Sequence, residues 1–143
     1  MKSQISTLHF TQLLSATPRG ARLARLLTTN QLKEWGWPPS CTASESAALV
    51  VAELAANAVT HARVRGRSFR LSLTIDAPDT LRVEVADPRG DRPPQPRTAN
   101  AAAFDLTAES GRGLLLVTAL ATTWGTAPYP PSGKTVWACL SLS

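Results

Sequence analysis

The chain has 143 residues, of which 43% are hydrophobic and 17% charged, and a net charge of +5 that permits contact with nucleotides, nucleic acid or an acidic protein surface. This length fits one globular domain over residues 1–143, and the lack of a long apolar run argues against a signal peptide or membrane span, so we expect a soluble cytoplasmic protein. Cys41 and Cys139 have no CxxC spacing and no histidine cluster, which argues against a zinc site or a disulfide framework.

The N-terminal part of the chain predicts a strand followed by a helix. Weak alternation of apolar and polar residues indicates a short strand within Ile5–Leu14. Thr17 is expected to cap a helix that begins at Pro18, because proline suits the first helical position. A leucine stripe follows, and Gly36 is expected to end this helix.

A second helix is predicted from Thr42 or Ser44 to about Ala62. At about 100° per residue, Glu53 and Asn57 lie about 40° apart on a polar face, opposite an arc of alanines and valines that suits packing on a sheet. The polar face presents a carboxylate and an amide one turn apart. An amphipathic helix with its polar face in water explains the same pattern.

Two alternating runs, Phe69–Ile75 and Leu81–Val85, predict a β-hairpin with a turn at Ala77–Asp79. Their apolar residues fall on one face, which is the expected partner for the alanine-rich side of the preceding helix. Asp87 comes directly after the second strand. A long segment with several prolines then follows, and we interpret it as a flexible lid at about residues 88–110; a disordered surface loop fits its composition as well.

Gly111 and Gly113 precede an apolar run that predicts a helix. Glycines at the start of a helix leave backbone N–H groups exposed at the positive end of the helix dipole, where a phosphate can bind. A simple turn accounts for the same pair of glycines. The chain is expected to close with a turn at Pro128–Gly133 and a strand at Thr135–Leu142.

Three signals therefore occur in a fixed order: Glu53 and Asn57 on a helix, Asp87 after a strand, and Gly-x-Gly opening a later helix. This order resembles the ATP-binding domain of the histidine-kinase-like ATPases (GHKL, or Bergerat fold). Over residues 8–142 the chain is most similar to the anti-sigma-factor serine/threonine kinase branch. There an N-terminal strand and a helix ending in Trp-Gly precede the Asn box, as they do here at Phe10, Pro18, Ala24, Arg25, Trp35 and Gly36.

The resemblance implies an α+β fold: a two-layer α/β sandwich with a mixed, mostly antiparallel sheet and about three helices on one face. It implies that Asn57 coordinates Mg²⁺ bridging the phosphates of ATP, and that Glu53 orients or deprotonates the attacking hydroxyl. Asp87 would accept a hydrogen bond from the adenine amine, and Thr135 would lie near the adenine. His61, one turn after Asn57, faces phosphate or has a structural role.

The two glycine boxes match the family unequally. Gly111 and Gly113 would let the lid and the helix N-terminus approach the phosphates, with Arg112 as an electrostatic contributor. The first box usually reads Asp-x-Gly-x-Gly, but only Gly90 stands there, between an arginine and an aspartate. This departure favours a protein with altered nucleotide binding.

Two functions follow from the resemblance. In the first, the protein sequesters a sigma factor and uses ATP and Mg²⁺ to phosphorylate a small anti-anti-sigma-like antagonist on Ser or Thr; the resemblance also implies a homodimer, because relatives commonly dimerise. The alternative is a catalytically inactive module, nucleotide-binding or nucleotide-free, that serves protein interaction in bacterial signalling. Nucleic-acid binding would rest only on the charge of four arginines: Arg63, Arg65, Arg67 and Arg70. A solvated loop and strand face explain these arginines as well, so we expect no direct contact with nucleic acid.

Overall fold

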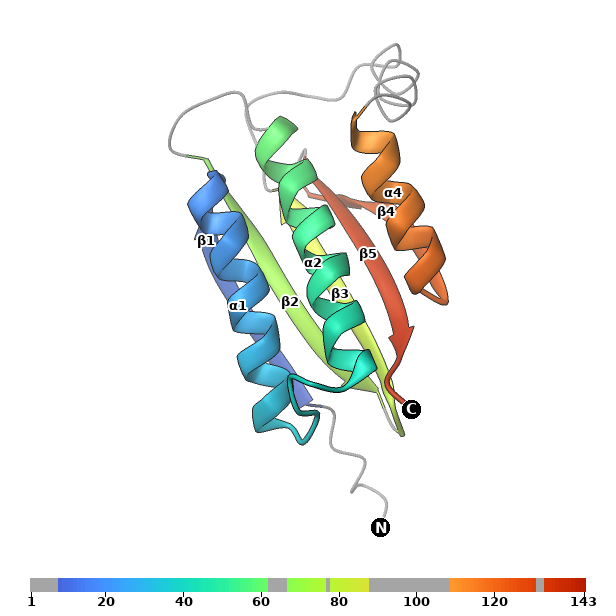
Figure 1. The fold of residues 1–143 in the computed structure, drawn as a ribbon. Helices are drawn as coiled ribbons and strands as arrows, with labels where there is room; N and C mark the ends of the chain where they lie inside the picture. Colours follow the sequence, from blue (N-terminus) through green and yellow to red (C-terminus); the bar gives the residue numbers. More distant parts are fainter. Residues whose placement is uncertain (1–7, 62–66, 77, 88–108, 131–132) are drawn as a thin grey trace.

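The computed structural model of the chain describes residues 8–61, 67–76, 78–87, 109–130 and 133–143, without the side chains of residues 61 and 109–113. Its helices cover one face of a five-stranded sheet (Figure 1). The elements are β1 (Leu8–Ser15), α1 (Pro18–Glu34), α2 (Thr42–His61), β2 (Ser68–Asp76), β3 (Thr80–Asp87), α4 (Glu109–Leu120), β4 (Thr123–Tyr129) and β5 (Gly133–Ser141). The predicted α+β two-layer sandwich is confirmed.

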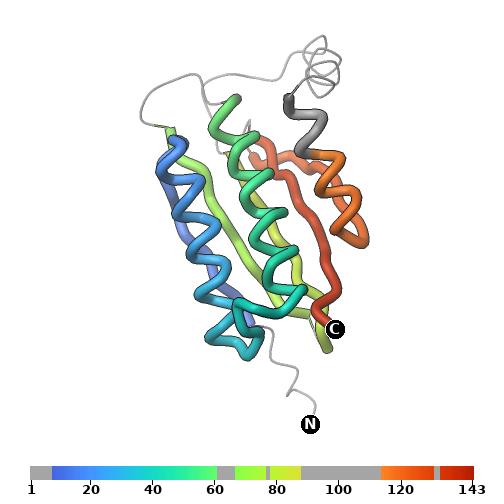
Figure 2. Tube along the Cα trace, in the orientation of Figure 1, coloured from blue at the N-terminus to red at the C-terminus, as the bar shows by residue number. Residues whose placement is uncertain are grey.

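The strand order across the sheet is β1-β2-β3-β5-β4. Each neighbouring pair of described strands is antiparallel, so no parallel pair occurs among them and the sheet is not mixed. Figure 2 shows the helices side by side over the sheet, with α2 between α1 and α4. The central helix α2 therefore lies over the middle of the sheet, against β3 and β5.

The start of α1 follows the prediction. The Thr17 side chain accepts a hydrogen bond from the Gly20 N–H at 3.0 Å, with Pro18 in the first turn. Gly20 is required here, because a Cβ atom at this position would lie 1.8 Å from the Ser15 carbonyl oxygen. The helix ends two residues before Gly36, whose φ of 109° is a backbone conformation that glycine adopts without strain.

The central hairpin agrees with the sequence pattern, whereas the packing face of α2 agrees only in part: Val51 and Ala55 of the predicted arc are in the core, and Leu54 joins them from the side of the helix that also carries Asn57. The buried residues of α2 are mostly small or β-branched; the helix contacts β3 and β5, and its buried residues share one core with the alternating buried residues of β2 and β3. This core contains Ala47, Val50, Val51, Leu54 and Ala55 of α2, together with Phe69, Leu71, Leu73, Ile75, Leu81, Val83 and Val85 of the hairpin.

Strand β4 is not predicted from the sequence. It forms the edge of the sheet by pairing with β5, with Gly125 opposite Trp137. A Cβ atom on Gly125 would lie 2.9 Å from the Trp137 ring, so the glycine makes room for an aromatic side chain from the neighbouring strand. Gly125, which suggests a loop when only the sequence is considered, is thus explained by a contact between two strands.

Helix α4 begins earlier than predicted. The helix starts at Glu109, so Gly111 and Gly113 lie within its first turns rather than before them. Each residue added to a helix forms one more backbone hydrogen bond, which lets the apolar run that follows extend the helix backward over the glycines. The first predicted residues of β1, at 5–7, lie outside the described part of the chain, as does the predicted lid at about residues 88–110 up to residue 108. The last two residues of the predicted lid, Glu109 and Ser110, belong instead to α4.

Candidate functional site

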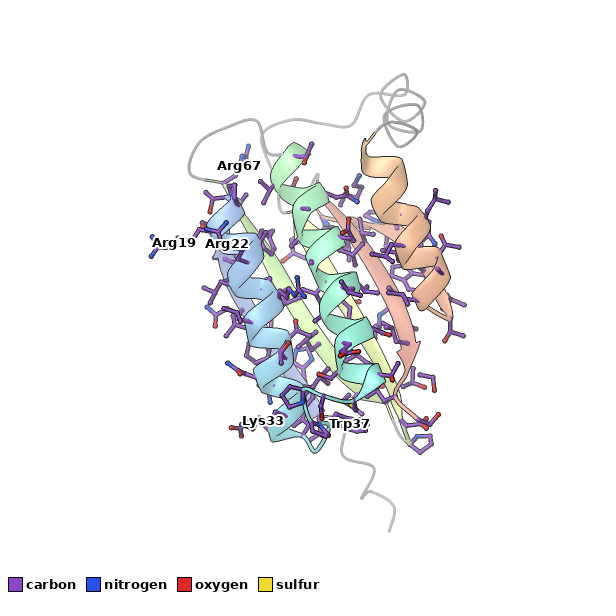
Figure 3. All side chains as sticks on the ribbon, viewed as in Figure 1. Arg19, Arg22, Lys33, Trp37 and Arg67 are labelled. Carbon is purple, nitrogen blue, oxygen red and sulfur yellow. The ribbon has the colours of Figure 1, made fainter. Side chains whose placement is uncertain are left out.

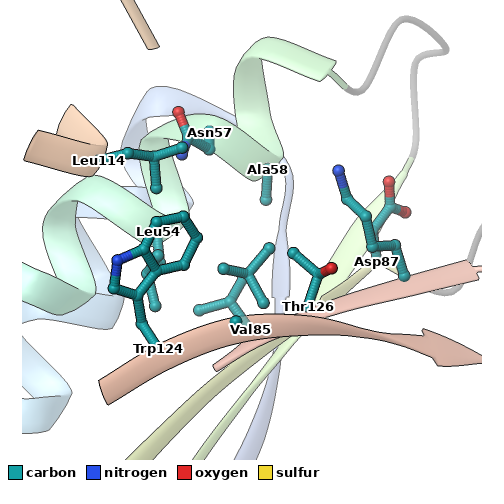
Figure 4. A pocket seen from close by; sticks show the side chains of 11 residues that line it. Leu54, Asn57, Ala58, Val85, Asp87, Leu114, Trp124 and Thr126 are labelled. Atoms are coloured by element: carbon teal, nitrogen blue, oxygen red, sulfur yellow. The ribbon is translucent and has the colours of Figure 1, made fainter. Parts of the chain in front are cut away.

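A cavity of about 320 Å³ lies between the helices and the sheet (Figure 4). Helix α2 contributes Leu54, Asn57 and Ala58, which are three and four residues apart and so share one face of the helix. Asn57 is half-buried and places its amide at the cavity wall. The polar position predicted from the sequence thus faces a cavity and not only water.

The sheet forms the opposite wall. Val85 and Asp87 of β3 pair directly with Val136 and Lys134 of β5, and all four residues line the cavity. Alternate residues of a strand share one face, which explains why each strand contributes two residues spaced two apart. An apolar floor made by the valines therefore ends at a carboxylate and an ammonium group on neighbouring strands.

The remaining wall comes from α4 and β4. Leu114 of α4 and Trp124, Gly125 and Thr126 of β4 line the cavity. Figure 4 shows Trp124 and Asp87 on opposite sides of Val85. The Trp124 indole N–H donates a hydrogen bond to Thr118 Oγ1 at 2.8 Å. Since this bond occupies the polar atom of the indole, the part of Trp124 left for the cavity is its apolar ring surface.

The chemistry of this cavity suits an organic ring with polar substituents. Its volume falls within the range of small-molecule sites, roughly 300–1,000 Å³, which are mostly apolar with a few placed polar groups. Leu54, Val85 and Val136 offer apolar surface, whereas Asp87 accepts hydrogen bonds and Lys134 donates them. Such a set fits a heteroaromatic base that carries a hydrogen-bond donor, and the cation also favours an anionic ligand.

The structure brings some of the predicted site residues together. Asn57 and Asp87, 30 positions apart in the chain, line the same cavity. Glu53 precedes the cavity residue Leu54 on α2 but is not among the described lining residues. Thr135 is buried between two lining residues, and strand alternation directs its side chain to the opposite face of the sheet.

Other predicted positions cannot be placed at the cavity. Gly90 lies outside the described residues. Gly111, Arg112 and Gly113 belong to the described backbone of α4, directly before the lining residue Leu114, but their side-chain surroundings are not described. The same holds for the side chain of His61, the last residue of α2.

Several lining residues were missed in the sequence. The predicted site lacks Trp124, Thr126 and Lys134, because the sequence analysis does not predict β4 as a strand. A signal was available: Trp124-x-Thr126 and Lys134-x-Val136 are two alternating pairs on either side of a proline-rich turn. Two such pairs joined by a short turn predict a hairpin with both pairs on one face.

The described arginines of the charge-based alternative lie away from the cavity. Arg67 comes just before β2, and Arg70 is a half-buried residue of β2 that pairs with Ala86; neither lines the cavity. Figure 3 shows Arg67 near the end of α1 that carries Arg19. Residues 63 and 65 are outside the described part of the chain.

No helix in the described parts of the chain has the length and apolar character needed to cross a membrane. Among the same residues, no group of three or more His, Cys, Asp or Glu side chains is placed to hold a metal ion. The amide oxygen of Asn57, together with oxygens of a bound ligand and water, is a ligand set that Mg²⁺ accepts.

Comparisons with known proteins agree with this geometry. A search of curated proteins gave no match. The crystal structure of the RsbU and RsbW domains of Rv1364c from Mycobacterium tuberculosis has a similar fold, with a TM-score of 0.64 and 21% sequence identity. The match covers 96% of this chain and 32% of that one, so the chain spans about a third of the solved chain's length. A family model for the histidine kinase-like ATPase domain matches residues 14–140, and the chain therefore belongs to the histidine kinase-like ATPase family.

Proposed function

We propose that the cavity binds Mg·ATP and that the protein acts as a serine/threonine kinase of the anti-sigma-factor type. The observation that carries this proposal is the meeting of Asn57 and Asp87 in one cavity, because the resemblance assigns these two residues to the metal and to the adenine. The apolar floor between them supports a base-binding role. Membership of the histidine kinase-like ATPase family supports the nucleotide.

In this proposal each polar group has one task. Asp87 accepts a hydrogen bond from the exocyclic amine of adenine, and Asn57 helps hold Mg²⁺ with the phosphate oxygens. The first turn of α4, which contains Gly111, binds phosphate through the free backbone N–H groups at the positive end of the helix dipole. Mg²⁺ neutralises charge on the phosphates when it is bound.

Glu53 is the proposed base. It lies one turn before Asn57 and outside the described lining of the cavity, a position from which it can meet a hydroxyl group of a second protein. Glu53 would take the proton of that Ser or Thr hydroxyl as its oxygen bonds to the γ-phosphorus and the bond to the β-phosphate oxygen breaks, leaving ADP. The proposed substrate is a small antagonist protein. The proposed second partner is a sigma factor, which this protein binds and sequesters.

The alternative is a module that docks partners without phosphoryl transfer. The sequence departure that favours it is the replacement of two expected glycines by Arg89 and Asp91, which lie outside the described residues. The two functions share the fold and differ in whether nucleotide binds and whether Glu53 takes part in transfer. They are separated by one binding experiment and one transfer experiment.

Thermal unfolding with and without Mg·ATP tests the nucleotide. A ligand that binds only the folded protein at 100 times its Kd stabilises it by roughly 2.7 kcal/mol, so ATP should raise the Tm. Asn57→Ala should abolish most of this rise, and Asn30→Ala, at an exposed position of α1, is the matched control. An unchanged Tm of the wild-type protein in millimolar Mg·ATP would refute ATP binding.

Phosphoryl transfer needs a substrate, which a pull-down from cell extract can supply. We expect radiolabel from γ-labelled ATP to appear on Ser or Thr of a copurified small protein. Glu53→Gln should leave ATP binding nearly intact and reduce transfer at least a hundredfold, in line with the usual contribution of a general base. Glu34→Gln, at the exposed end of α1, is the control. ATP binding with no labelled protein would favour the docking module.

A further inference from the structure

Trp124 occupies a position in the cavity that neither the resemblance nor the sequence pattern assigns. It is half-buried on β4, and its ring forms the apolar wall opposite Asp87 (Figure 4). Figure 4 shows the indole nitrogen on the side away from Ala58 and Val85, and the six-membered ring on the side toward them. An aromatic carbon surface is therefore presented to whatever fills the cavity.

A short hydrogen-bond chain fixes this orientation. Thr118 Oγ1 accepts the indole N–H of Trp124 at 2.8 Å and donates to the Leu114 carbonyl oxygen at 2.8 Å. The Thr118 hydroxyl thus donates its single proton to the helix backbone and accepts the indole N–H with one of its lone pairs. Because Leu114 directly follows the glycines of α4, these two hydrogen bonds connect the ring of Trp124 to the first turns of that helix.

We infer that Trp124 is a base-contacting residue that the resemblance does not assign, and that Thr118 is the positioning residue that holds its ring against the base of the nucleotide. This inference rests on the proposed nucleotide site. Every nucleic base has a π-face that can pack on an aromatic side chain, and such contacts contribute substantially to binding. Asp87 then reads the edge of the base at one end of the cavity, while Trp124 contacts ring surface at the other.

Intrinsic fluorescence tests the contact with the base. The chain has four tryptophans, and we expect adenosine and Mg·ATP to quench the wild-type emission through Trp124, whereas magnesium tripolyphosphate leaves it unchanged. Trp124→Phe should lose the quenching, and Trp137→Phe, on the other face of the sheet, should keep it. Equal quenching in Trp124→Phe, or quenching by tripolyphosphate alone, would overturn the contact with the base.

Isothermal titration with Mg·ATP tests the energetics. Trp124→Ala should raise the Kd roughly tenfold, given the usual effect of removing a base-stacking aromatic residue. Thr118→Val should raise it about threefold, since a net hydrogen bond of ordinary strength is lost, and Thr118→Ser should restore it. Thr29→Val is the matched control, because Thr29 also donates to the carbonyl oxygen four residues earlier but lies on α1 and is not among the described lining residues of the cavity.

A double-mutant cycle shows whether Thr118 acts through Trp124. Phenylalanine at position 124 has no N–H group, so adding Thr118→Val to Trp124→Phe should change the Kd no further. Additive effects would contradict the positioning role. If the wild-type protein binds ATP and neither Trp124→Ala nor Thr118→Val alters the Kd, the inference fails and the proposed function stands. If the wild-type protein binds no ATP by titration, the proposed function itself fails.

Discussion

The two faces of strands β3 and β5 carry polar groups in different settings. On the face toward the helices, Asp87 and Lys134 lie at the edge of a cavity. On the outer face, Arg82 Nε lies 2.8 Å from Glu84 Oε2, and the guanidinium carbon lies 4.6 Å from the centre of the Trp137 ring. The outer groups contact one another, and the inner groups line a cavity that can hold a ligand.

The outer face of these strands carries side chains that contact one another, and the inner face carries side chains at a cavity. Both faces arise from the same period-two alternation, so strand propensity does not distinguish them. What separates them is the layer of helices, which buries the apolar inner face except where α2, α4 and β4 leave the cavity. Substitutions on the two faces should therefore differ in their effects on the free energy of unfolding and on ligand affinity.

The largest difference should appear in the free energy of unfolding. Leu73 is fully buried on the inner face of β2, and its replacement by alanine should cost about 2–5 kcal/mol because it leaves a cavity in the core. Ser72→Ala, one residue away on the outer face, removes one exposed hydrogen bond to Thr11 Oγ1, of 3.2 Å, and should cost no more than about 1 kcal/mol. Urea denaturation of both variants measures this. Similar losses for the two would contradict the assignment of faces.

Ligand affinity should separate the faces next. Asp87→Asn removes the charged acceptor at the cavity and should weaken Mg·ATP binding about tenfold or more. Glu84→Gln makes the same chemical change on the outer face and should leave the Kd unchanged. Isothermal titration of the two matched variants gives the comparison. A loss of affinity in Glu84→Gln equal to that in Asp87→Asn would show that the cavity is not the ligand site.

Gly125 lies where the two faces meet, because its backbone lines the cavity and the Trp137 ring covers it from outside. Gly125→Ala should destabilise the fold by about 1–3 kcal/mol through overpacking against the ring. Adding Trp137→Ala should remove that penalty, since the new methyl group then meets no ring. Urea denaturation of the single and double variants tests the coupling, and strictly additive losses would exclude the proposed clash.

These residues also show what the sequence can predict. The Thr17 cap and the β2–β3 hairpin rest on local spacing, and the structure confirms them; the packing face of α2 is confirmed only for part of its predicted arc. The family resemblance identified Asn57 and Asp87, and both line the cavity. Each of these predictions depends on periodicity or on an ordered motif, which a single sequence displays.

The remaining parts of the site depend on pairing between strands. Strand β4 contains Gly125 and Pro128, which are unfavourable in strands, and it is held by its pairing with β5. When the alternating pairs on either side of the turn are not recognised as a hairpin, neither the position of Trp124 at the cavity nor its hydrogen bond to Thr118 follows from the sequence. The start of α4 was misplaced for a related reason, because glycines there were interpreted by local preference alone.

The smallest expected effect concerns the outer ion pair itself. Burial lowers the pKa of Arg82, but the hydrogen bond to Glu84 and its charge raise it more, so the net direction is upward. The two side chains are 34% and 36% exposed, and water therefore screens the pair. Glu84→Gln should cost only about 0.2–1 kcal/mol in low salt, and the difference from wild type should shrink in 1 M salt. Urea denaturation at both ionic strengths measures it. A loss that persists in high salt would mean that Glu84 acts by packing or by orienting Arg82 over Trp137. The contribution of the outer face to stability would then depend on packing, like that of the inner face, and not on charge.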